Sequence, residues 1–395
     1  MINSSISSLV ELTQCLGVFV SGLVLVVFIA RKLFLSKSFA VILYSWHSLF
    51  CYLYVNYVTA AGGDAIDYFE QSLSGIVDVG IGTSAIPFLV RPFSYYLGFS
   101  FLASNLVFNI IGTVGLLFFY AALKFAVKDK SLVYQRLIIV IVMLPSCNFW
   151  TSAIGKDGIA FLAIAIVVWS TKEAKTRIIP IIFAVILMLI VRIQIAALLV
   201  LAIMFSNLLQ AHKFRLGTMI SLAGSSVGLI LLFPATLSYI GLELNSLQDL
   251  TNYIDRRQSF NQEGGGAVDI TQLNVAEKFL TYLFRPTFFE ATTVPQLASA
   301  FDNAFFIMIF LLGAKFLISG SKLFSRRWVL TIYSLSSWLL LASTTANLGI
   351  AVRQKWMILP AVFMIILSAA PFTKRYSEEQ RRRFSKLKNF GYHAS

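Results

Sequence analysis

Charged residues are scarce in this chain of 395 residues: only 13% are Asp, Glu, Lys or Arg, about half the ~25% typical of soluble domains. The chain also holds only three Cys and three His, all scattered, which excludes a disulfide framework and gives no clustered metal ligands. No Walker A sequence occurs, so the chain has no nucleotide-binding motif that could drive transport with ATP. These absences exclude the soluble-enzyme, disordered and disulfide-rich secreted classes.

Apolar residues dominate instead. They make up 58% of the chain, with 35 Phe and 15 Tyr, and the mean hydropathy is +0.79. A helix that crosses a bilayer needs roughly 20 mostly apolar residues, and the sequence has eleven such stretches, several of them short. We expect an all-α, polytopic membrane protein with spans at 9–30, 39–60, 97–123, 137–151, 159–171, 178–191, 195–210, 216–240, 301–320, 328–346 and 356–371.

The formal charge of +14 is a signal of membrane topology. Lys and Arg favour the cytoplasmic ends of membrane spans, and 23 of the 32 lie in alternate connections, which hold only four acids. This pattern predicts an outer N-terminus and a cytoplasmic C-terminus, and it removes the reason to expect a nucleic-acid partner. The basic segments are 31–38, 124–136, 172–177, 211–215, 315–327 and the tail 372–395.

The remaining nine basic residues fall on the predicted outer side, where the same rule disfavours them. Several sit in tight connections that would hold their side chains at membrane depth, where charged groups usually face a cavity or a partner. Converging cations suit an anionic headgroup such as a lipid-linked diphosphate, because Arg binds phosphate in a bidentate manner. The alternative is that each pairs with a nearby acid or reaches lipid phosphates. The nine are Arg91, Lys156, Arg192, Arg256, Arg257, Lys278, Arg285, Arg353 and Lys355.

The first long outer loop, 61–96, carries candidate catalytic carboxylates. Gly62 and Gly63 allow a tight turn after the second span, and Asp64 and Asp67 follow, three residues apart. A carboxylate at the membrane surface could act as a general base that takes a proton from an acceptor hydroxyl. Asp64 could instead cap a helix, and both roles could coexist.

The second long outer loop, 241–300, contains a Gly264-Gly265-Gly266 run that suits a mobile lid. A loop of this length in a compact protein is usually functional. Residues 1–371 are therefore expected to form one transmembrane catalytic domain, and 372–395 a basic cytoplasmic tail that could also contact anionic lipid.

Short motifs follow one another on the predicted outer side of the chain. They are Gly63-Asp64 with Tyr68, Pro145-Ser146, Phe149-Trp150-Thr151-Ser152, Lys156-Asp157, Arg192-x-Gln194, Arg285-Pro286 and Asn347-x-Gly349-x-x-x-Arg353. In this order they resemble the bacterial oligosaccharide repeat-unit polymerases of O-antigen and capsule synthesis (Wzy and EpsG-like proteins), which are treated as relatives of the GT-C membrane glycosyltransferases. The resemblance covers about residues 40–370, and the order of the motifs is more specific than any one of them.

The resemblance implies a glycosyltransferase of the bacterial inner membrane that extends a polysaccharide on undecaprenyl diphosphate at the outer face. The growing chain would leave its lipid and join the sugar of a newly flipped repeat unit. By this resemblance the family's acidic residue maps to Asp64, with Asp67 as its rival. Diphosphate-binding residues would be Arg91, Lys156, Arg192, Arg285 and Arg353, and Asp157, Gln194, Glu290 and Asn347 are further candidates.

No cofactor is expected, and we expect metal-independent catalysis, since Arg and Lys can supply the charge of a divalent ion. The expected partners are the undecaprenyl-diphosphate-linked oligosaccharide, membrane lipid, and a chain-length regulator and flippase of the same pathway. Two other classes remain open: a GT-C transferase that uses a polyprenyl-phosphate sugar, and a polysaccharide or lipid transporter or flippase. A transporter would favour charges at mid-membrane and broken-helix repeats.

Overall fold

The computed structural model describes residues 8–74, 79–172, 177–209, 216–242, 246–261, 266–270, 273–318 and 327–373. Asp78, Gly264, Gly265 and nearly all of the basic tail lie outside these residues. Within them the chain is all-helical, with two isolated bridges and no strand. The all-α expectation is therefore confirmed for the part of the chain that the structure describes.

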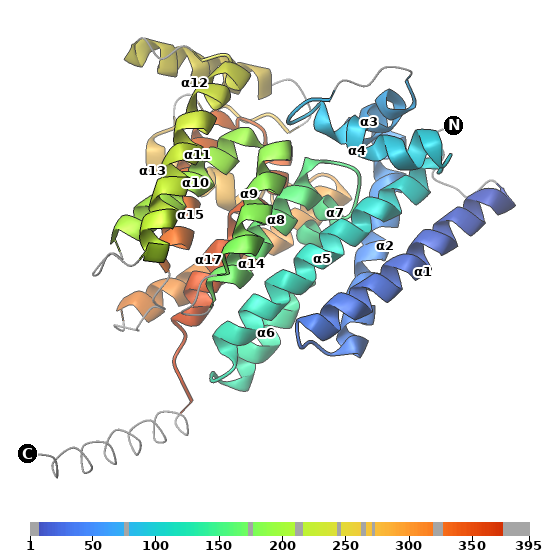
Figure 1. Cartoon of the computed structure of the whole chain (residues 1–395), viewed down its shortest axis with the longest axis horizontal. Coiled ribbons are helices and arrows are strands. Elements are labelled where there is room, and N and C mark those ends of the chain that lie inside the picture. Colours follow the sequence, from blue (N-terminus) through green and yellow to red (C-terminus); the bar gives the residue numbers. More distant parts are fainter. Residues whose placement is uncertain are drawn as a thin grey trace, which may run out of the picture.

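The helices fall into long segments and short ones (Figure 1). The long helices are α1 (Leu9–Lys32), α2 (Lys37–Ala61), α5 (Phe101–Val127), α8 (Lys156–Thr171), α9 (Ile178–Val191), α10 (Ile193–Leu209), α11 (Leu216–Ile240), α12 (Leu247–Asn261), α14 (Val294–Ile318) and α15 (Arg327–Thr344). The short ones are α3 (Asp64–Leu73), α4 (Ala85–Arg91), a π-helical turn η1 (Pro92–Tyr96), α6 (Leu132–Val142), α7 (Pro145–Thr151), α13 (Val275–Phe284), α16 (Leu348–Gln354), a 3₁₀ turn η2 (Lys355–Met357) and α17 (Leu359–Ser368).

Helix boundaries follow from local capping chemistry. The hydroxyls of Ser8, Ser36 and Ser100 accept backbone N–H bonds in the first turns of α1, α2 and α5, which satisfies donors that a helix start leaves unpaired. Pro145 begins α7 and separates it from α6, because proline has no N–H to continue the earlier helix.

Each predicted span has a helix, but the count of eleven spans stays a prediction. Among the described residues, six helical segments are long and apolar enough to cross a membrane: α1, α2, α5, α6 with α7, α11 and α14. A seventh arises if α16, η2 and α17 form one span broken by a 53° bend. The helices α9 and α10 are apolar but shorter. The structure thus supports a multi-pass helical protein.

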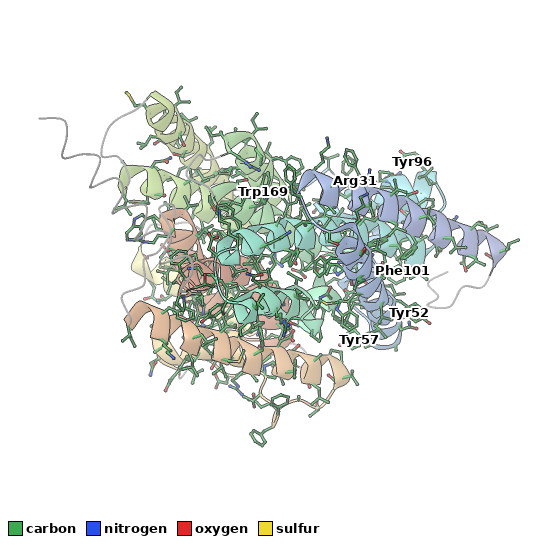
Figure 2. The ribbon with its side chains drawn as sticks, turned by 90° about the horizontal axis from the view of Figure 1, so that it is seen from below. Arg31, Tyr52, Tyr57, Tyr96, Phe101 and Trp169 are labelled. Carbon is green, nitrogen blue, oxygen red and sulfur yellow. The ribbon has the colours of Figure 1, made fainter. Side chains whose placement is uncertain are left out.

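The core lies around α5 and α8, which pack against each other along their lengths. Phe119 of α5 and Phe161 of α8 are fully buried and meet at their ring edges, 5.9 Å between centroids. In contrast, α1 and α11 bury little of their apolar surface, and α1 and α14 lie at the periphery (Figure 2). Apolar side chains that face outward around a buried centre are expected of helices that contact lipid.

The two long loops contain helices of their own and lie at one end of the molecule. Loop 61–96 contains α3, α4 and η1, and loop 241–300 contains α12 and α13. Figure 1 shows α3, α4 and α12 at the end opposite to the α5–α6 turn. This agrees with the alternation of basic connections, and the sidedness stays a prediction.

Candidate functional site

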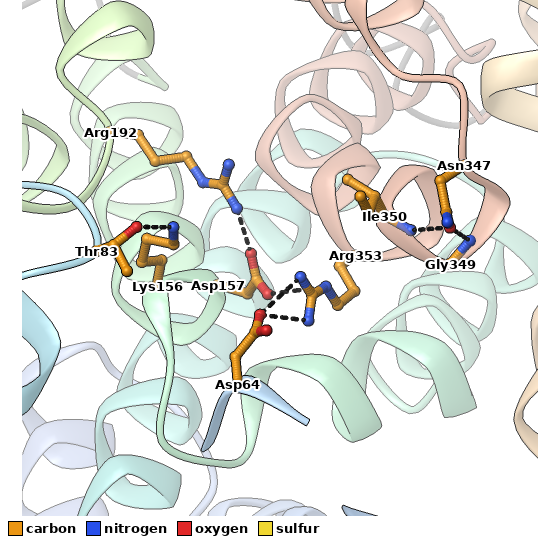
Figure 3. Close-up of polar contacts among 9 residues, drawn as sticks. All are labelled: Asp64, Thr83, Lys156, Asp157, Arg192, Asn347, Gly349, Ile350 and Arg353. Atoms are coloured by element: carbon orange, nitrogen blue, oxygen red, sulfur yellow. Dashed lines mark hydrogen bonds and ion pairs between the residues drawn. The ribbon is translucent and has the colours of Figure 1, made fainter. Parts of the chain in front are cut away.

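Four helix ends that are distant in the sequence converge at this end of the molecule. Asp64 is in the first turn of α3, and Lys156 and Asp157 begin α8. Arg192 lies in the one-residue break between α9 and α10, and Arg353 is in the last turn of α16. All five were candidates from the sequence, and the fold places them together (Figure 3).

Two glycines position the carboxylates. Gly62 ends α2 with φ of 79°, a left-handed conformation that glycine adopts readily, and the chain turns there into α3 with Asp64. In α8, a Cβ on Gly158 would lie 2.7 Å from the carbonyl oxygen of Thr151, so only glycine lets α8 begin this close to the end of α7. Asp64 is the first helical residue after its cap, Gly63, and is not itself the cap.

The four charged side chains form an alternating series, here called the ion-pair cluster: Asp64, Arg353, Asp157 and Arg192 (Figure 3). Both terminal nitrogens of Arg353 donate to Oδ2 of Asp64 at 3.1 Å. The Nε of Arg353 lies 3.7 Å from Oδ2 of Asp157, and Arg192 donates to Oδ1 of Asp157 at 2.8 Å. Each carboxylate thus has at least one guanidinium partner, and Arg353 joins the two.

The cluster runs from an exposed end to a buried end. The exposed side-chain fraction falls from 52% at Asp64 to 23% at Arg353, 13% at Asp157 and 9% at Arg192. Within the part of the chain that the structure describes, Oδ1 of Asp64 accepts no hydrogen bond. An exposed carboxylate with one oxygen oriented by Arg353 and the other open can take a proton from a bound hydroxyl.

Asp157 serves a different purpose from Asp64. Burial alone would raise the pKa of its carboxyl, but Arg192 and Arg353 beside it lower the pKa below the usual value. Asp157 also occupies the first turn of α8, where the helix dipole favours a negative charge. It is therefore held ionised between two guanidinium groups and orients both.

Lys156 adds a cation whose charge is easily lost. Its Nζ donates to Oγ1 of Thr83 at 2.9 Å, and it precedes the predicted span 159–171. Burial, followed by repulsion from Arg192, lowers the pKa of Lys156 to about 8. An anion that binds here would stabilise the protonated form.

A cleft of ≈ 590 Å³ adjoins the cluster at Trp150. The guanidinium of Arg353 lies 5.5 Å from the centroid of the Trp150 ring, and this residue also lines the cleft. The other lining residues are Tyr57, Gly266, Ala267, Val268, Arg285, Pro286, Glu290, Thr292, Thr293, Pro295, Gln296, Ser299, Asn347, Leu348, Gly349 and Val352.

Arg285 and Glu290 form an ion pair on one wall of this cleft. Nε of Arg285 donates to Oε1 of Glu290 at 2.6 Å, and a second guanidinium nitrogen contacts the same oxygen. Thr287 donates its N–H and its hydroxyl to the other carboxylate oxygen. The hydrogen bond from Arg285 is the main reason that the pKa of Glu290 lies below its usual value. Glu290 thus orients Arg285 towards the cleft.

Asn347 also lines the cleft. Its side chain caps α16 by accepting the N–H bonds of Gly349 and Ile350. The residue also forms a bridge with Ala267, which brings the segment after the glycine run against the start of α16. Asn347 therefore holds in place the helix that carries Arg353.

Some sequence candidates lie outside the cluster. Asp67 is exposed on α3 and joins none of the cluster's ion pairs among the described residues. Arg91 lies over the rings of Tyr95 and Tyr96 and donates to the carbonyl of Ser74. The side-chain oxygen of Gln194, near Arg192 in sequence, is buried and has no hydrogen-bond partner in the described part of the chain.

Sequence reasoning missed several residues beneath the site. Lys355 was counted only as an outer cation, but its side chain is buried together with Asp302 and Asn303 of α14. The Asp302-Asn303 pair sits inside a predicted span, and a polar pair in an apolar stretch is the signal that could have drawn attention to it.

No family model, curated protein or solved structure matches this chain. Within the described residues, no group of three or more His, Cys, Asp or Glu could hold a metal ion. The expectation of metal-independent chemistry is not tested by this observation. Function must therefore be inferred from the geometry and chemistry of the site.

Proposed function

We propose that the protein is a glycosyltransferase that polymerises undecaprenyl-diphosphate-linked oligosaccharide repeat units into O-antigen or capsular polysaccharide at the outer face of the bacterial cytoplasmic membrane. One observation carries the proposal: the exposed carboxylate of Asp64 is hydrogen-bonded to Arg353 within a cluster that also contains Arg192. A base for an acceptor hydroxyl and cations for an anionic leaving group are therefore neighbours at one surface.

The cations suit a diphosphate. Arg192, Arg353 and Lys156 carry one positive charge more than Asp64 and Asp157 neutralise, and a bound diphosphate would find net attraction. Charge-assisted hydrogen bonds from arginine to phosphate oxygens are among the stronger polar contacts in proteins. The same contacts would stabilise the charge that develops on the departing diphosphate.

The proposed reaction is a direct displacement at the anomeric carbon. A hydroxyl of the incoming repeat unit attacks the anomeric carbon of the growing chain, and its proton passes to Asp64. A new C–O bond forms while the bond to the diphosphate breaks, and undecaprenyl diphosphate leaves with the electron pair. A single displacement of this kind inverts the anomeric configuration.

The cleft beside the cluster supports a saccharide substrate. Trp150 and Tyr57 provide flat apolar surfaces, and Gln296, Asn347 and Thr293 supply polar groups within the same ≈ 590 Å³. Sugar rings have an apolar face and a polar edge, so they fit a cleft with aromatic walls and hydrogen-bonding side chains.

The test uses purified protein in lipid nanodiscs with undecaprenyl-diphosphate-linked oligosaccharide extracted from cells that make the polymer. The expected product is a ladder of polymers that differ by one repeat unit, and release of undecaprenyl diphosphate in proportion to the bonds formed. Transfer of a single sugar from a polyprenyl phosphate would assign the protein to the other GT-C class. Movement of the lipid across vesicles without bond formation would identify a flippase. Either outcome would overturn the proposal.

A further inference from the structure

Lys355 is a buried lysine three residues after Val352, which lines the cleft. It opens the turn η2 immediately after α16, and only 1% of the residue is exposed. Its Nζ donates to the carbonyl oxygen of Leu283 at 3.0 Å and to Oδ1 of Asn303 at 2.6 Å. The ammonium group is therefore committed to partners inside the protein and is not available to a lipid headgroup.

Asn303 links Lys355 to the carbonyl of Pro286. Its amide nitrogen donates to the carbonyl oxygen of Pro286 at 2.8 Å, while its oxygen accepts from Lys355. Lys355 and Asn303, with the carbonyls of Leu283 and Pro286, are here called the brace. Every bond of the brace joins segments that are far apart in the sequence or belong to different helices.

The brace buries an amine where an apolar residue would be less costly to bury. A buried ammonium loses its hydration and needs compensation. Burial lowers the pKa of Lys355 to about 7, and the nearby carboxyl of Asp302, which is also fully buried, partly offsets this decrease. Asp302 itself accepts the N–H of Ser146 at 2.7 Å, and Trp356 donates to the Ser146 hydroxyl at 3.1 Å. The turn that holds Lys355 is thereby fixed on a second side.

Residues of the brace lie next to Arg285 and Arg353 in the sequence. Arg285 lies between Leu283 and Pro286, whose carbonyls accept the bonds, and Arg353 lies two residues before Lys355. Arg285 lines the cleft, and so do Leu348, Gly349 and Val352 of α16, the helix that carries Arg353. The brace therefore ties the segment that carries Arg285 to the residues that follow Arg353.

We propose that Lys355 and Asn303 are positioning residues that set the separation of Arg285 and Arg353, so that both arginines contact one diphosphate. The inference rests on the proposed function and names a structural device within it. A diphosphate has two charged groups and can engage both arginines at once. A monophosphate has one charged group and needs only one of the arginines, so its binding does not depend on their separation.

The test compares farnesyl diphosphate with farnesyl monophosphate, each titrated by calorimetry into the full-length protein in detergent. The wild type should bind the diphosphate at least about tenfold more tightly. Lys355→Met removes the charge and both bonds, and it should abolish most of this preference while the affinity for the monophosphate changes by less than about twofold. A simple loss of fold would weaken both ligands together.

Asn303→Asp is the second variant, because Lys355→Met leaves Asp302 without its nearby cation and could unfold the protein. The aspartate still accepts from Lys355 but can no longer donate to Pro286, so it cuts the brace at one bond. It should also lose the preference. Lys130→Met is the matched control: Lys130 is also buried and donates to the carbonyls of Ser368 and Ala370, but at the opposite end of the molecule.

The outcomes separate the brace from the function on which it rests. If Asn303→Asp, and Lys355→Met where it folds, still prefer the diphosphate over the monophosphate, the positioning role of the brace is refuted and the proposed function is not affected. An equal loss in Lys130→Met shows that any buried lysine has this effect, which also overturns it. If the wild type shows no preference for the diphosphate, both the proposed diphosphate substrate and the role of the brace are refuted.

Discussion

Arg353 donates two hydrogen bonds to a single carboxylate oxygen of Asp64, although 289 residues separate the two in the sequence. This contact joins the start of α3 to the end of α16 and brings the proposed base within reach of the proposed diphosphate site. The two oxygens of Asp64 therefore differ: Oδ2 accepts both hydrogen bonds from Arg353, and Oδ1 is the oxygen that would take the proton in the proposed reaction. The following predictions depend on this arrangement and on the predicted topology.

Asp64→Asn should leave a folded protein that makes almost no polymer. The amide keeps the size of the carboxylate and can still accept a bond from Arg353, but it cannot take a proton from a hydroxyl. The measurement is the polymer ladder in the nanodisc assay, with Glu70→Gln, an exposed acid on the same helix, as the control that keeps activity. Asp67→Asn should be milder.

Two results would relocate the base. If Asp64→Asn polymerises normally while Asp67→Asn does not, Asp67 is the base. If both are active, the base lies elsewhere, with Asp157 or Glu290 as the next candidates from the sequence.

Arg353→Lys should be a poor replacement, although it keeps the charge. Lysine has no planar fork, so it cannot repeat the paired bonds to Asp64 and also contact Asp157. Charged hydrogen bonds contribute ~1.5–3 kcal/mol each, and kcat/KM should fall roughly tenfold to a hundredfold. Arg192→Lys and Arg285→Lys should also impair the enzyme. Alanine at all three positions with normal polymer and normal protein levels would contradict a diphosphate role for the arginines.

Asp157→Asn should destabilise the protein more than Asp64→Asn does. Asp157 is largely buried between Arg192 and Arg353, and removal of one partner from a buried ion pair costs about 3–5 kcal/mol. The measurement is the midpoint of thermal unfolding in detergent. Because folding lowers the pKa of Asp157 below 3.8, its stabilising contribution in the wild type is fully present above that pH and is lost as the pH falls below it. Equal midpoints for both variants would refute the buried role of Asp157.

Binding of farnesyl diphosphate should weaken as the pH rises through about 8, the pKa to which burial lowers Lys156. Below this pH the ammonium is charged and attracts the anion, and above it the neutral amine does not. Titrations from roughly pH 7 to roughly pH 9 measure the decrease, and the ligand should be bound with proton uptake at the upper end. Lys156→Arg keeps its charge throughout and should give a flat profile. The same decrease in that variant would exclude Lys156 as its source.

A topology reporter that is active only in the periplasm should be silent when fused after residue 395 and active after about residue 265. The reason is the distribution of Lys and Arg among alternate connections. The opposite pattern would place Asp64 and the cleft in the cytoplasm, and the proposed reaction at the outer face would then be untenable.

Local patterns in the sequence predicted the helices well, whereas the count of eleven membrane spans stays a prediction. Apolar stretches such as 9–30 and 39–60 correspond to long helices, because helix formation depends on neighbouring residues. The predicted spans 178–191 and 195–210 are helical but short. Whether a short apolar helix crosses the bilayer depends on the helices that cover it, and a hydropathy pattern does not contain this information.

The sequence by itself determined a helical chain with long apolar stretches and with rare charges gathered in a few connections, because apolar length and charge position are local properties. Only the tertiary structure decided which charges meet. The sequence favours Asp64 over its rival Asp67 only by a short motif, whereas in the structure it is Asp64, not Asp67, that contacts Arg353. The sequence predicts Lys355 to be another basic residue of the outer side, yet its side chain is buried and hydrogen-bonded to Asn303. The physical reason is that an ion pair forms between the helix ends that packing brings together, and the packing of the apolar faces is set by the whole chain.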